Sequence, residues 1–354
     1  MRLLILSRYD RLGSSSRLRI FQYLPHLQES GFELTIAPLF GDDYVRALYG
    51  GRISKISVLI AYITRLGFML RARRFDAVWV EKEMLPWMPA FVEFGLFPSK
   101  VPLIADYDDA VFHRYDLHRS SLVRRVLGKK IDAVMHRADL VLVGNEYLRE
   151  RALLAGSKRV EILPTVVDVS RYQTADEMRE QIVTIGWIGS PSTAKFLRII
   201  APALQEVASL RNVRIVTVGA NADQVQGMPI EAHKWTEESE VEEIRQFDIG
   251  IMPLPDEPFE RGKCGYKLIQ CMACGKAVVA SPVGVNGVVV RDGIDGILAS
   301  TNSEWIAALN KLIDEAGLRR QMGVSGRLRV EQDYSLKQAA PRLVGLLRSC
   351  LENV

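Results

Sequence analysis

The sequence has few cysteines, and they are unevenly placed. Of four in 354 residues, three crowd residues 264–274 and the fourth is Cys350, which does not fit a disulfide framework and favours a reduced, cytosolic setting. Cys271 and Cys274 have CxxC spacing, but no second ligand pair or nearby His completes a zinc site. We therefore interpret both as small buried core residues.

Long apolar runs are also lacking. No segment reaches the roughly 18–20 apolar residues that a membrane-spanning helix needs. The run MRLLILSRYD at residues 1–10 is too short and has no cleavage site for a signal peptide, so it predicts a first buried strand.

The sequence also lacks a large net charge and the glycine fingerprint of dinucleotide-binding folds. The formal net charge is only +4, so a nucleic-acid partner would need a concentrated basic patch with aromatic platforms or a known binding motif, and no such motif is present. Neither half contains G-x-G-x-x-G, which argues against an oxidoreductase.

What the sequence does contain is a repeated alternation of apolar runs and helical patterns. The chain is too long for one ordinary core, and the alternation predicts an α/β fold with two doubly wound parallel sheets facing a cleft. We expect an N-terminal acceptor-binding domain at 1–166, a C-terminal donor-binding domain at 167–335 and a helix crossing back at 336–354. Expected strands are 3–6, 34–38, 77–80, 103–105, 140–143, 160–163, 183–188, 213–218, 249–253 and 277–280, and expected helices include 17–30, 54–74, 121–137, 194–210, 241–246 and 266–274.

Two turns of the first half are candidates for acceptor chemistry, because open parallel sheets bind ligands outside the carboxyl ends of their strands. The first reads RYDRLGSSSRLR at 8–19, a donor-rich turn suited to a hydroxylated or phosphorylated acceptor, although an ordinary flexible turn remains the alternative. Its candidate residues are Gly13, Ser14, Ser15, Ser16 and Arg17. The second reads ADYDDAVF at 105–112 and is expected to deliver Asp106, Asp108 and Asp109 to a strand end, where close carboxylates raise one another's pKa or need a cation. Asp106 and Asp108 also match the weak metal-binding pattern DxD, with helix capping as the alternative.

Two turns of the second half are candidates for phosphate binding. GWIGSPSTAK at 186–195 and FERGKCGYK at 259–267 each lead from a glycine-containing turn into a helix, and helix N-termini point free N–H groups at anions. Three cations, Arg261, Lys263 and Lys267, surround Gly262 and Gly265, which is costly without an anion nearby. A solvated basic loop and neutral capping are the alternatives.

The segment GYKLIQCMACGKAVVASPVGVNGVVVRDGIDGILA, with FDIGIMPLPDEPFERGKC before it and WIGSPSTAKFL earlier, resembles the donor-binding half of the GT-B-fold glycosyltransferases of family 4. The resemblance implies two Rossmann-like domains, a nucleotide-sugar donor on the C-terminal one, metal independence and retention of anomeric configuration. That argues against a metal at Asp106 and Asp108, and no cofactor besides the donor is expected. The donor-binding residues expected from the motifs are Gly189, Ser190, Lys195, Arg261, Lys263, Cys264, Gly265, Tyr266, Lys267 and Gln270.

The sequence departs from that family at its paired glutamates. Gly262 and Gln270 stand at the two positions, so the first has no side chain and the second has an amide that still hydrogen-bonds a ribose hydroxyl. Ser190 replaces a basic residue, and Asp108 and Asp109 align with a His-Asp pair, which makes them the expected catalytic residues. We therefore expect backbone N–H groups around Gly189 and Gly265, with the lysines, to hold the diphosphate.

The expected function is sugar transfer to a hydroxyl acceptor, in polysaccharide or glycolipid assembly. A nucleotide-sugar epimerase and a non-catalytic nucleotide-sugar-binding subunit are the alternatives. Residues 53–74 form an apolar helix with a basic end, and residues 114–137 carry seven Lys or Arg against two Asp. These segments suggest a cytoplasmic protein that touches an anionic membrane peripherally, with core packing as the alternative.

Overall fold

The computed structural model describes residues 1–51, 53–174 and 182–352 and divides the chain into two units. The first unit is Met1–Thr165 with Gln338–Val354, and the second is Val166–Lys337. The sequence-based boundaries lie after residues 166 and 335. Each unit holds one six-stranded sheet, so the prediction of an α/β fold with two doubly wound sheets is confirmed.

The first unit is built on a wholly parallel sheet of strand order β2-β1-β3-β4-β5-β6. Its strand order reverses between β1 and β3, because β2 lies on one side of β1 and all later strands on the other. In such sheets the crevice at the reversal is the usual ligand site. The strands are β1 (Arg2–Leu6), β2 (Glu33–Ile36), β3 (Ala77–Glu81), β4 (Leu103–Tyr107), β5 (Leu140–Val143) and β6 (Val160–Ile162).

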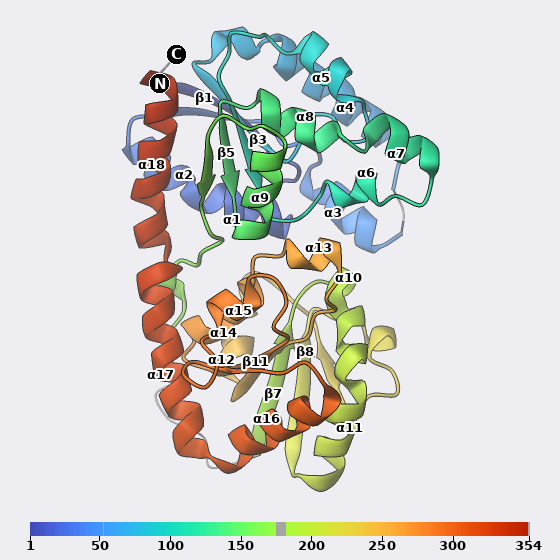
Figure 1. Cartoon of the computed structure of the whole chain (residues 1–354), viewed down its shortest axis with the longest axis vertical. Coiled ribbons are helices and arrows are strands. Elements are labelled where there is room, and N and C mark those ends of the chain that lie inside the picture. The colour runs from blue at the N-terminus through green and yellow to red at the C-terminus, as the bar shows by residue number, and fades with distance from the viewer. Residues whose placement is uncertain (52, 175–181, 353–354) are drawn as a thin grey trace. The chain divides into compact units, whose positions relative to one another are not determined.

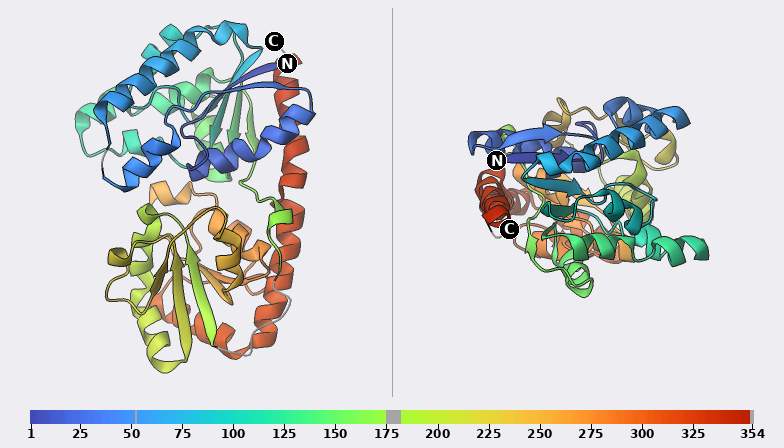
Figure 2. Two further views of the ribbon diagram at one scale, coloured as in Figure 1. Left: turned by 180° about the vertical axis from the view of Figure 1, so that it is seen from behind. Right: turned by 90° about the horizontal axis from the view of Figure 1, so that it is seen from above.

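Helices cover this sheet and follow most of its strands (Figures 1 and 2). The expected helix at 17–30 is instead α1, a 3-10 turn at Phe21–Tyr23 and α2. The last helix, α18 (Leu336–Glu352), belongs mainly to this unit, where Arg348 donates to the Ser30 carbonyl at 2.7 Å. The other helices are α1 (Ser14–Arg19), α2 (Leu24–Glu29), α3 (Asp42–Tyr49), α4 (Lys55–Leu70), α5 (Ala90–Leu96), α6 (His113–Asp116), α7 (Ser121–Leu127), α8 (Lys130–Arg137) and α9 (Glu146–Leu154).

The second unit has the strand order β12-β11-β10-β7-β8-β9, again all parallel. Its reversal lies between β7 and β10, so the loops after these two strands border the expected ligand crevice. The short edge strand β12 was not expected from the sequence. The strands are β7 (Val183–Ile188), β8 (Val213–Val218), β9 (Glu231–His233), β10 (Ile249–Met252), β11 (Ala277–Ala280) and β12 (Ile297–Leu298).

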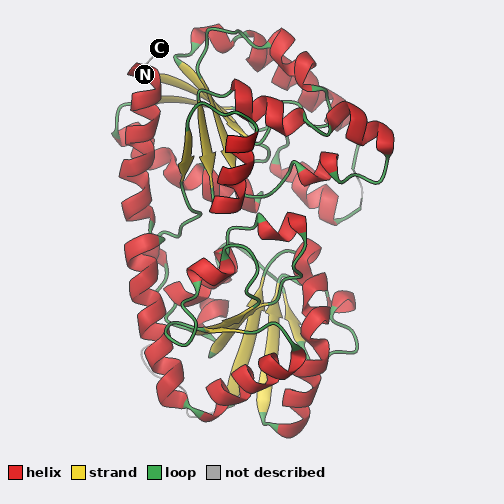
Figure 3. Ribbon diagram, viewed as in Figure 1, coloured by secondary structure: helices red, strands yellow, loops and turns green. Residues whose placement is uncertain are grey.

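Helices lie on both faces of the second sheet (Figure 3). The expected helix at 194–210 is broken into α10, a 3-10 stretch at Lys195–Ile200 and α11. No helix within the described ranges is both long and apolar enough to cross a bilayer. The helices are α10 (Pro191–Ala194), α11 (Ala201–Leu210), α12 (Glu240–Arg245), α13 (Pro258–Arg261), α14 (Tyr266–Ala273), α15 (Asn286–Val289), α16 (Asn302–Asp314) and α17 (Ala316–Asp333).

Strand alternation divides the core of the second unit into two apolar layers. In β11, Val278 and Ala280 join one buried cluster while Ala277 and Val279 join the other. Successive side chains of a strand point to opposite faces, so a strand buried on both faces must be apolar throughout. This explains why the continuous run AVVA is a strand.

A buried ion pair ties α1 to β4 in the first unit. Arg19 donates from Nε to Asp106 at 2.7 Å and also to the Leu163 carbonyl at 2.6 Å, and both charged side chains are fully buried. Burial raises the pKa of Asp106 to about 6, although the Arg19 charge lowers it. Asp106 stands at the carboxyl end of β4 as expected, and the neighbouring Asp108 also raises its pKa, but its side chain is buried against Arg19.

We expect Arg19→Met to destabilise the first unit by about 3–5 kcal/mol, since it leaves the Asp106 carboxylate buried without its partner. Arg19→Met combined with Asp106→Leu should recover most of that loss, because no charge is then buried. Urea unfolding of both variants measures the two values. A double variant as unstable as the single one would contradict this explanation.

Candidate functional site

In the second unit, the chain segments that end β7 and begin α14 meet at Gly189. A Cβ at residue 189 would lie 2.4 Å from Cε of Lys267 and 2.8 Å from the ring of Trp187. The Nζ of Lys267 lies 5.5 Å from the centroid of the Trp187 ring. Glycine at 189 is therefore required for Lys267, on the first turn of α14, to lie over the end of β7. The structure thus brings together two of the expected donor-binding residues, Gly189 and Lys267.

The amide of Gly189 is engaged by the sheet. It donates to the Val218 carbonyl at 3.0 Å, which extends the pairing of β7 with β8. This N–H is therefore already engaged, and binding of a phosphate by other N–H groups around Gly189 stays a prediction. The turn that follows offers the hydroxyls of Ser190 and Ser192, 2.8 Å apart. A Cβ at Gly219 would lie 2.2 Å from the Gly189 carbonyl oxygen and 3.2 Å from Cβ of Trp235, so the loops after β8 and β9 close the other side of this turn.

Gly265 starts α14 in a left-handed backbone conformation, with φ 65°. Such a φ favours glycine, and a Cβ there would lie 3.2 Å from both Val285 and Val289. The glycine therefore lets the α14 N-terminus pack against α15. The first turn of α14 has no acidic residue, so its N–H groups and the positive end of its dipole can attract an anion. Tyr266, the first residue of the helix, is half-buried.

The basic loop before α14 is partly neutralised by carboxylates that the sequence prediction did not consider. Arg261 pairs with Asp256 through two bonds, of 2.7 and 3.1 Å, at an exposed position. Glu260 is buried; burial raises its pKa, while Lys263 and Lys195 lower it. Lys195 and Lys263 thus share one acidic neighbour, and the expected cluster of cations is a mixed cluster.

Gln270 lies inside a buried hydrogen-bonded group. Its amide nitrogen donates to the Tyr172 hydroxyl at 3.2 Å, and Gln270 as a whole is only 3% exposed. Tyr172 donates to Glu240 at 3.0 Å, and Trp235 Nε1 donates to the other oxygen of Glu240 at 2.9 Å. The Tyr266 hydroxyl lies 3.3 Å from that of Tyr172. Gln270 therefore supports the loop bearing Trp235 through Tyr172 and Glu240, a role that the sequence prediction missed.

Two cysteines of the second unit, Cys271 and Cys274, are packing residues. Cys271 and Cys274 are buried, and burial raises the pKa of both thiols, that of Cys274 to about 12. This confirms their interpretation as core residues. Cys264, in the loop before α14, is half-exposed. Across the described ranges of the chain, no group of three His, Cys, Asp or Glu side chains could hold a metal ion.

In the first unit, Lys82 follows β3 at the strand-order reversal with a strained backbone. Its φ is 68°, a conformation that is uncommon for residues other than glycine and that clusters at functional sites. Its Nζ lies 2.9 Å from Asp108 Oδ1, 2.9 Å from Ser15 Oγ and 3.8 Å from Glu81. The loops after β1, β3 and β4 therefore converge on one ammonium group.

Ser15 and Asp108 complete this arrangement. Ser15 donates to Asp108 Oδ2 at 2.5 Å. Burial opposes ionisation of Asp108, but Lys82 and Ser15 outweigh it and lower its pKa to about 2. Burial also opposes the charge of Lys82, and Asp108 and Glu81 outweigh it, so the pKa of Lys82 is raised. Asp108 is therefore an ionised, internally paired carboxylate; Asp109 is half-buried next to it.

The expected acceptor turn is divided between surface and core. Gly13 allows it to fold, since a Cβ there would lie 2.3 Å from Cβ of Tyr9. Ser14 is exposed and Ser15 half-buried, whereas Ser16 and Arg17 are buried. Ser16 accepts from the Tyr9 amide at 3.0 Å and donates to Glu81 at 2.5 Å. Ser16 therefore bonds within the fold, and acceptor binding by Ser16 and Arg17 stays a prediction.

A second charged cluster, also missed, lies behind the same loop. Glu83 pairs with Arg8 at 3.0 Å and with Lys130 at 2.6 Å, and Lys130 also pairs with Glu93 at 2.8 Å. The Tyr115 hydroxyl donates to Glu83 at 2.9 Å and accepts from the Trp87 amide at 3.0 Å. The sequence signal was the triplet EKE at 81–83, directly after an apolar strand.

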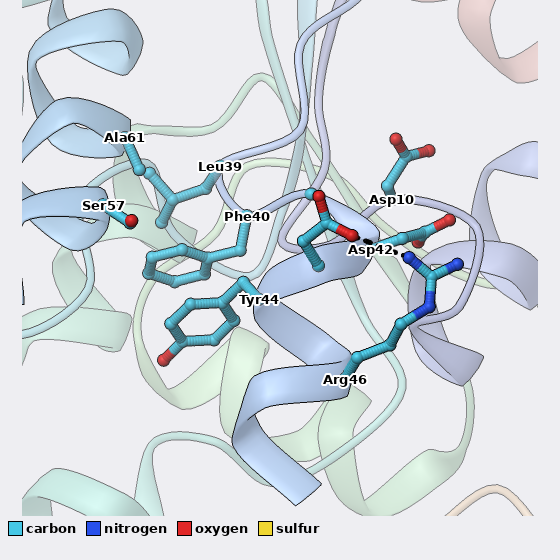
Figure 4. Close-up of a pocket in the computed structure, with 10 residues that line it drawn as sticks. Asp10, Leu39, Phe40, Asp42, Tyr44, Arg46, Ser57 and Ala61 are labelled. Carbon is cyan, nitrogen blue, oxygen red and sulfur yellow. Dashed lines mark hydrogen bonds and ion pairs between the residues drawn. The ribbon is translucent and has the colours of Figure 1, made fainter. Parts of the chain in front are cut away.

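A cavity of about 540 Å³ opens beside the loop that follows β2 (Figure 4). Phe40 and Tyr44 stack there with ring centroids 4.0 Å apart, and Asp42 accepts from the Leu12 amide at 2.8 Å. Ser57 and Ala61 of α4 form part of its wall. Aromatic faces with carboxylates and hydroxyls suit a hydroxylated molecule.

Asp108→Asn should lower the stability of the first unit most at neutral pH. Because the folded pKa of Asp108, about 2, lies below its ordinary 3.8, its ionisation contributes about 2 kcal/mol above pH 4, and that contribution is lost as the pH falls towards 2. The unfolding free energies of wild type and variant should converge by this amount over that range. Asp43→Asn, at an exposed carboxylate, is the control; equal convergence in both variants would contradict the assignment.

The second unit matches a known family by sequence. Residues 179–315 match the family model described as glycosyl transferases group 1. An uncharacterised glycosyltransferase of Methanocaldococcus jannaschii is 35% identical over 83 residues, which are 23% of this chain and 21% of that protein. A D-inositol 3-phosphate glycosyltransferase of Mycobacterium ulcerans is 25% identical over 222 residues, 55% of this chain and 46% of that one. The chain thus spans about half or less of the curated relatives it matches.

Solved structures match over the whole chain. The Anabaena protein HepE, crystallised with UDP, has a TM-score of 0.74 at 16% identity, covering 99% of this chain and 100% of that one. Sucrose-phosphate synthase of Thermosynechococcus elongatus has a TM-score of 0.75 at 14% identity, covering 100% of both chains. These likenesses establish the fold. The two Rossmann-like units have the GT-B fold, and residues 179–315 of the second unit are similar to the glycosyl transferases of group 1.

Proposed function

We propose that the chain transfers a sugar from a nucleotide-diphosphate sugar to a hydroxyl of an acceptor, with the donor on the second unit. The observation that carries this proposal is the position of Lys267 over Gly189, at the strand-order reversal of the second sheet. A cation, a helix N-terminus and a strand-end turn converge there on one spot, which is the arrangement that a diphosphate needs.

Departure of the nucleoside diphosphate is the step that this site would assist. Cleavage of the bond between the anomeric carbon and the diphosphate oxygen leaves negative charge on that oxygen. Lys267 and the first-turn N–H groups of α14 would stabilise the charge, because donors fixed in place before reaction lower the barrier. Lys195 and Lys263 would add positive charge, reduced by their shared neighbour Glu260.

The first unit would hold the acceptor. Asp108, with a pKa of about 2 and two internal partners, suits orientation of Lys82 and Ser15 better than proton abstraction at neutral pH. We therefore assign the acceptor hydroxyl to Asp109 and to the exposed Ser14. The cavity beside Phe40 and Tyr44 would take further hydroxyl groups of the acceptor.

The finer assignments follow from the family resemblance. They are retention of anomeric configuration, independence of metal ions, and a place at the cytoplasmic face of a membrane in polysaccharide or glycolipid assembly. The substrates are a nucleotide-sugar donor and a glycan or lipid-linked acceptor.

A second candidate function is donor binding without turnover. It is favoured by Gly262, which ends α13 and has no side chain, and by Gln270, which is engaged in a buried group. Incubation with nucleotide sugars separates the candidates. Release of nucleoside diphosphate with acceptor indicates transfer, an isomerised donor indicates an epimerase, and binding alone indicates a non-catalytic subunit.

Lys267→Ala should reduce donor turnover by about 10²–10³-fold, because it removes the charge nearest the proposed leaving group. Release of nucleoside diphosphate measures turnover, and thermal unfolding checks that the fold is retained. Lys311→Ala, at an exposed position on α16, is the matched control and should turn over normally. Near-normal turnover of Lys267→Ala would remove Lys267 from the mechanism.

Turnover should be unchanged after dialysis against EDTA, because lysines and backbone N–H groups neutralise the leaving diphosphate in this mechanism. Initial rates before and after chelation, and again after addition of Mg²⁺ or Mn²⁺, measure the effect. A rate that vanishes on chelation and returns with either metal would contradict a metal-independent reaction.

A further inference from the structure

The first unit exposes large apolar side chains that no packing within the unit explains. We call them the apolar face and define it by six residues: Ile56, Leu59, Ile60 and Ile63 of α4, Phe91 of α5 and Leu122 of α7. Ile56 is 72% exposed, Phe91 75% and Leu122 69%. A single exposed apolar residue is ordinary, but a contiguous set of large ones marks an interaction surface.

Helix α4 is apolar on two sides, and only one of them faces the core. Arg65 and Met69 are buried, whereas Ile56, Ile60 and Ile63 point away from them and are exposed. The spacing 56, 59, 60, 63 is that of one helical face. A surface helix needs one apolar stripe to pack against its own sheet, so the second stripe is available for something outside the unit.

The apolar face continues from α4 across the loop after β3 to α7. The Tyr62 hydroxyl of α4 donates to the Pro86 carbonyl of that loop at 2.7 Å. The next residue, Trp87, contacts the rings of Tyr115 and His118, just before α7, at centroid distances of 5.2 and 5.7 Å. Figures 1 and 2 show α4 and α7 on the same side of the first unit.

Trp87 combines a strained backbone with a half-exposed side chain. Its backbone φ is 62°, a strained conformation for a tryptophan, and half of the side chain is exposed. The bond from its amide to the Tyr115 hydroxyl holds this conformation. Tryptophan is the side chain enriched at membrane–water interfaces, because its large ring has an apolar body and a polar N–H.

Basic residues border the apolar face, and acidic ones are missing from the segments that contain α4 and α7. Residues 53–74 and 117–131 contain no Asp or Glu. Exposed basic residues at the ends of α4 and along α7 are Lys55, Arg71, Arg73, Arg74, Arg124, Arg125 and Lys129. Of these, Lys55, Arg71, Arg73 and Arg74 form no ion pair with any residue that the structure describes.

We propose that the apolar face docks on the surface of an anionic lipid bilayer. The apolar side chains would enter the boundary between headgroups and acyl chains while the bordering arginines and lysines bind lipid phosphates, as interfacial helices do. A second copy of the chain fits less well, because pairing two such faces would bring their basic borders together.

The docking proposal does not itself depend on the proposed glycosyl transfer. It deepens that function in one respect, since Ser57 and Ala61 of α4 line the cavity beside Phe40 and Tyr44. If the cavity holds acceptor hydroxyls, then docking through α4 places it next to the bilayer, where the sugar of a lipid-linked acceptor would lie. This last step rests on the proposed function.

The test is cosedimentation of the full chain, without substrates, with vesicles of phosphatidylcholine alone or with 30% phosphatidylglycerol. We expect binding to the anionic vesicles that weakens at least tenfold as NaCl is raised from about 20 to 500 mM, since salt screens the basic border. Ile56→Ser with Ile60→Ser, and separately Arg73→Glu with Arg74→Glu, should each weaken binding at least tenfold. Trp87 fluorescence should shift to the blue on binding, and Trp87→Phe should abolish the shift.

Leu210→Ser and Arg320→Glu, at exposed positions of the second unit, are the matched controls and should bind as wild type does. Failure to sediment with anionic vesicles at low salt, or equal binding by the Ile56/Ile60 variant, would overturn the proposal. Concentration-dependent self-association that Ile56→Ser with Ile60→Ser abolishes would assign the face to a second copy instead. Because no substrate is present, an inactive enzyme that still binds vesicles would refute only the proposed transfer.

Discussion

The close approach of Lys267 to the backbone of Gly189 is the contact on which the donor site depends. It exists because residue 189 has no side chain, so a lysine from α14 can lie over the end of β7 and against Trp187. The parallel sheet fixes both partners, since β7 and β10 end at the same edge and the loops after them meet at the strand-order reversal. Around this contact, the buried group of Gln270, Tyr172 and Glu240 holds the loop of Trp235 in place.

In the first unit, charged side chains near the strand-order reversal of the sheet pair with one another. Carboxylates and cations are paired inside it, Asp106 with Arg19 and Asp108 with Lys82, so few charges remain for a ligand. A buried pair contributes little net stability, because desolvation offsets attraction, but it fixes geometry when its hydrogen bonds are satisfied. The pairs therefore serve mainly to hold the loops after β1, β3 and β4 in one arrangement, and the strained backbone of Lys82 is part of that arrangement.

Sequence patterns predicted the strands well where burial is two-sided. β5 and β11, which read LVLV and AVVA, have the predicted bounds, because a strand buried on both faces leaves an uninterrupted apolar run. Prediction was poorer for a helix interrupted by proline and for a very short edge strand. The helix expected at 194–210 contains Pro202 and begins with a short turn, and its first part is a 3-10 helix. Edge strand β12 has only two residues, too few for any periodic pattern.

The sequence by itself determined the α/β class, the two sheets and the glycine and lysine positions of the donor turns, because periodicity and glycine are local properties. Only the tertiary structure decided which charges meet. Glu260 beside Lys195, Asp106 inside the core and Lys82 against Ser15 all join residues that are distant in sequence. Pairing of this kind depends on the order of strands in the sheet, which brings distant loops to one edge and which no local pattern encodes.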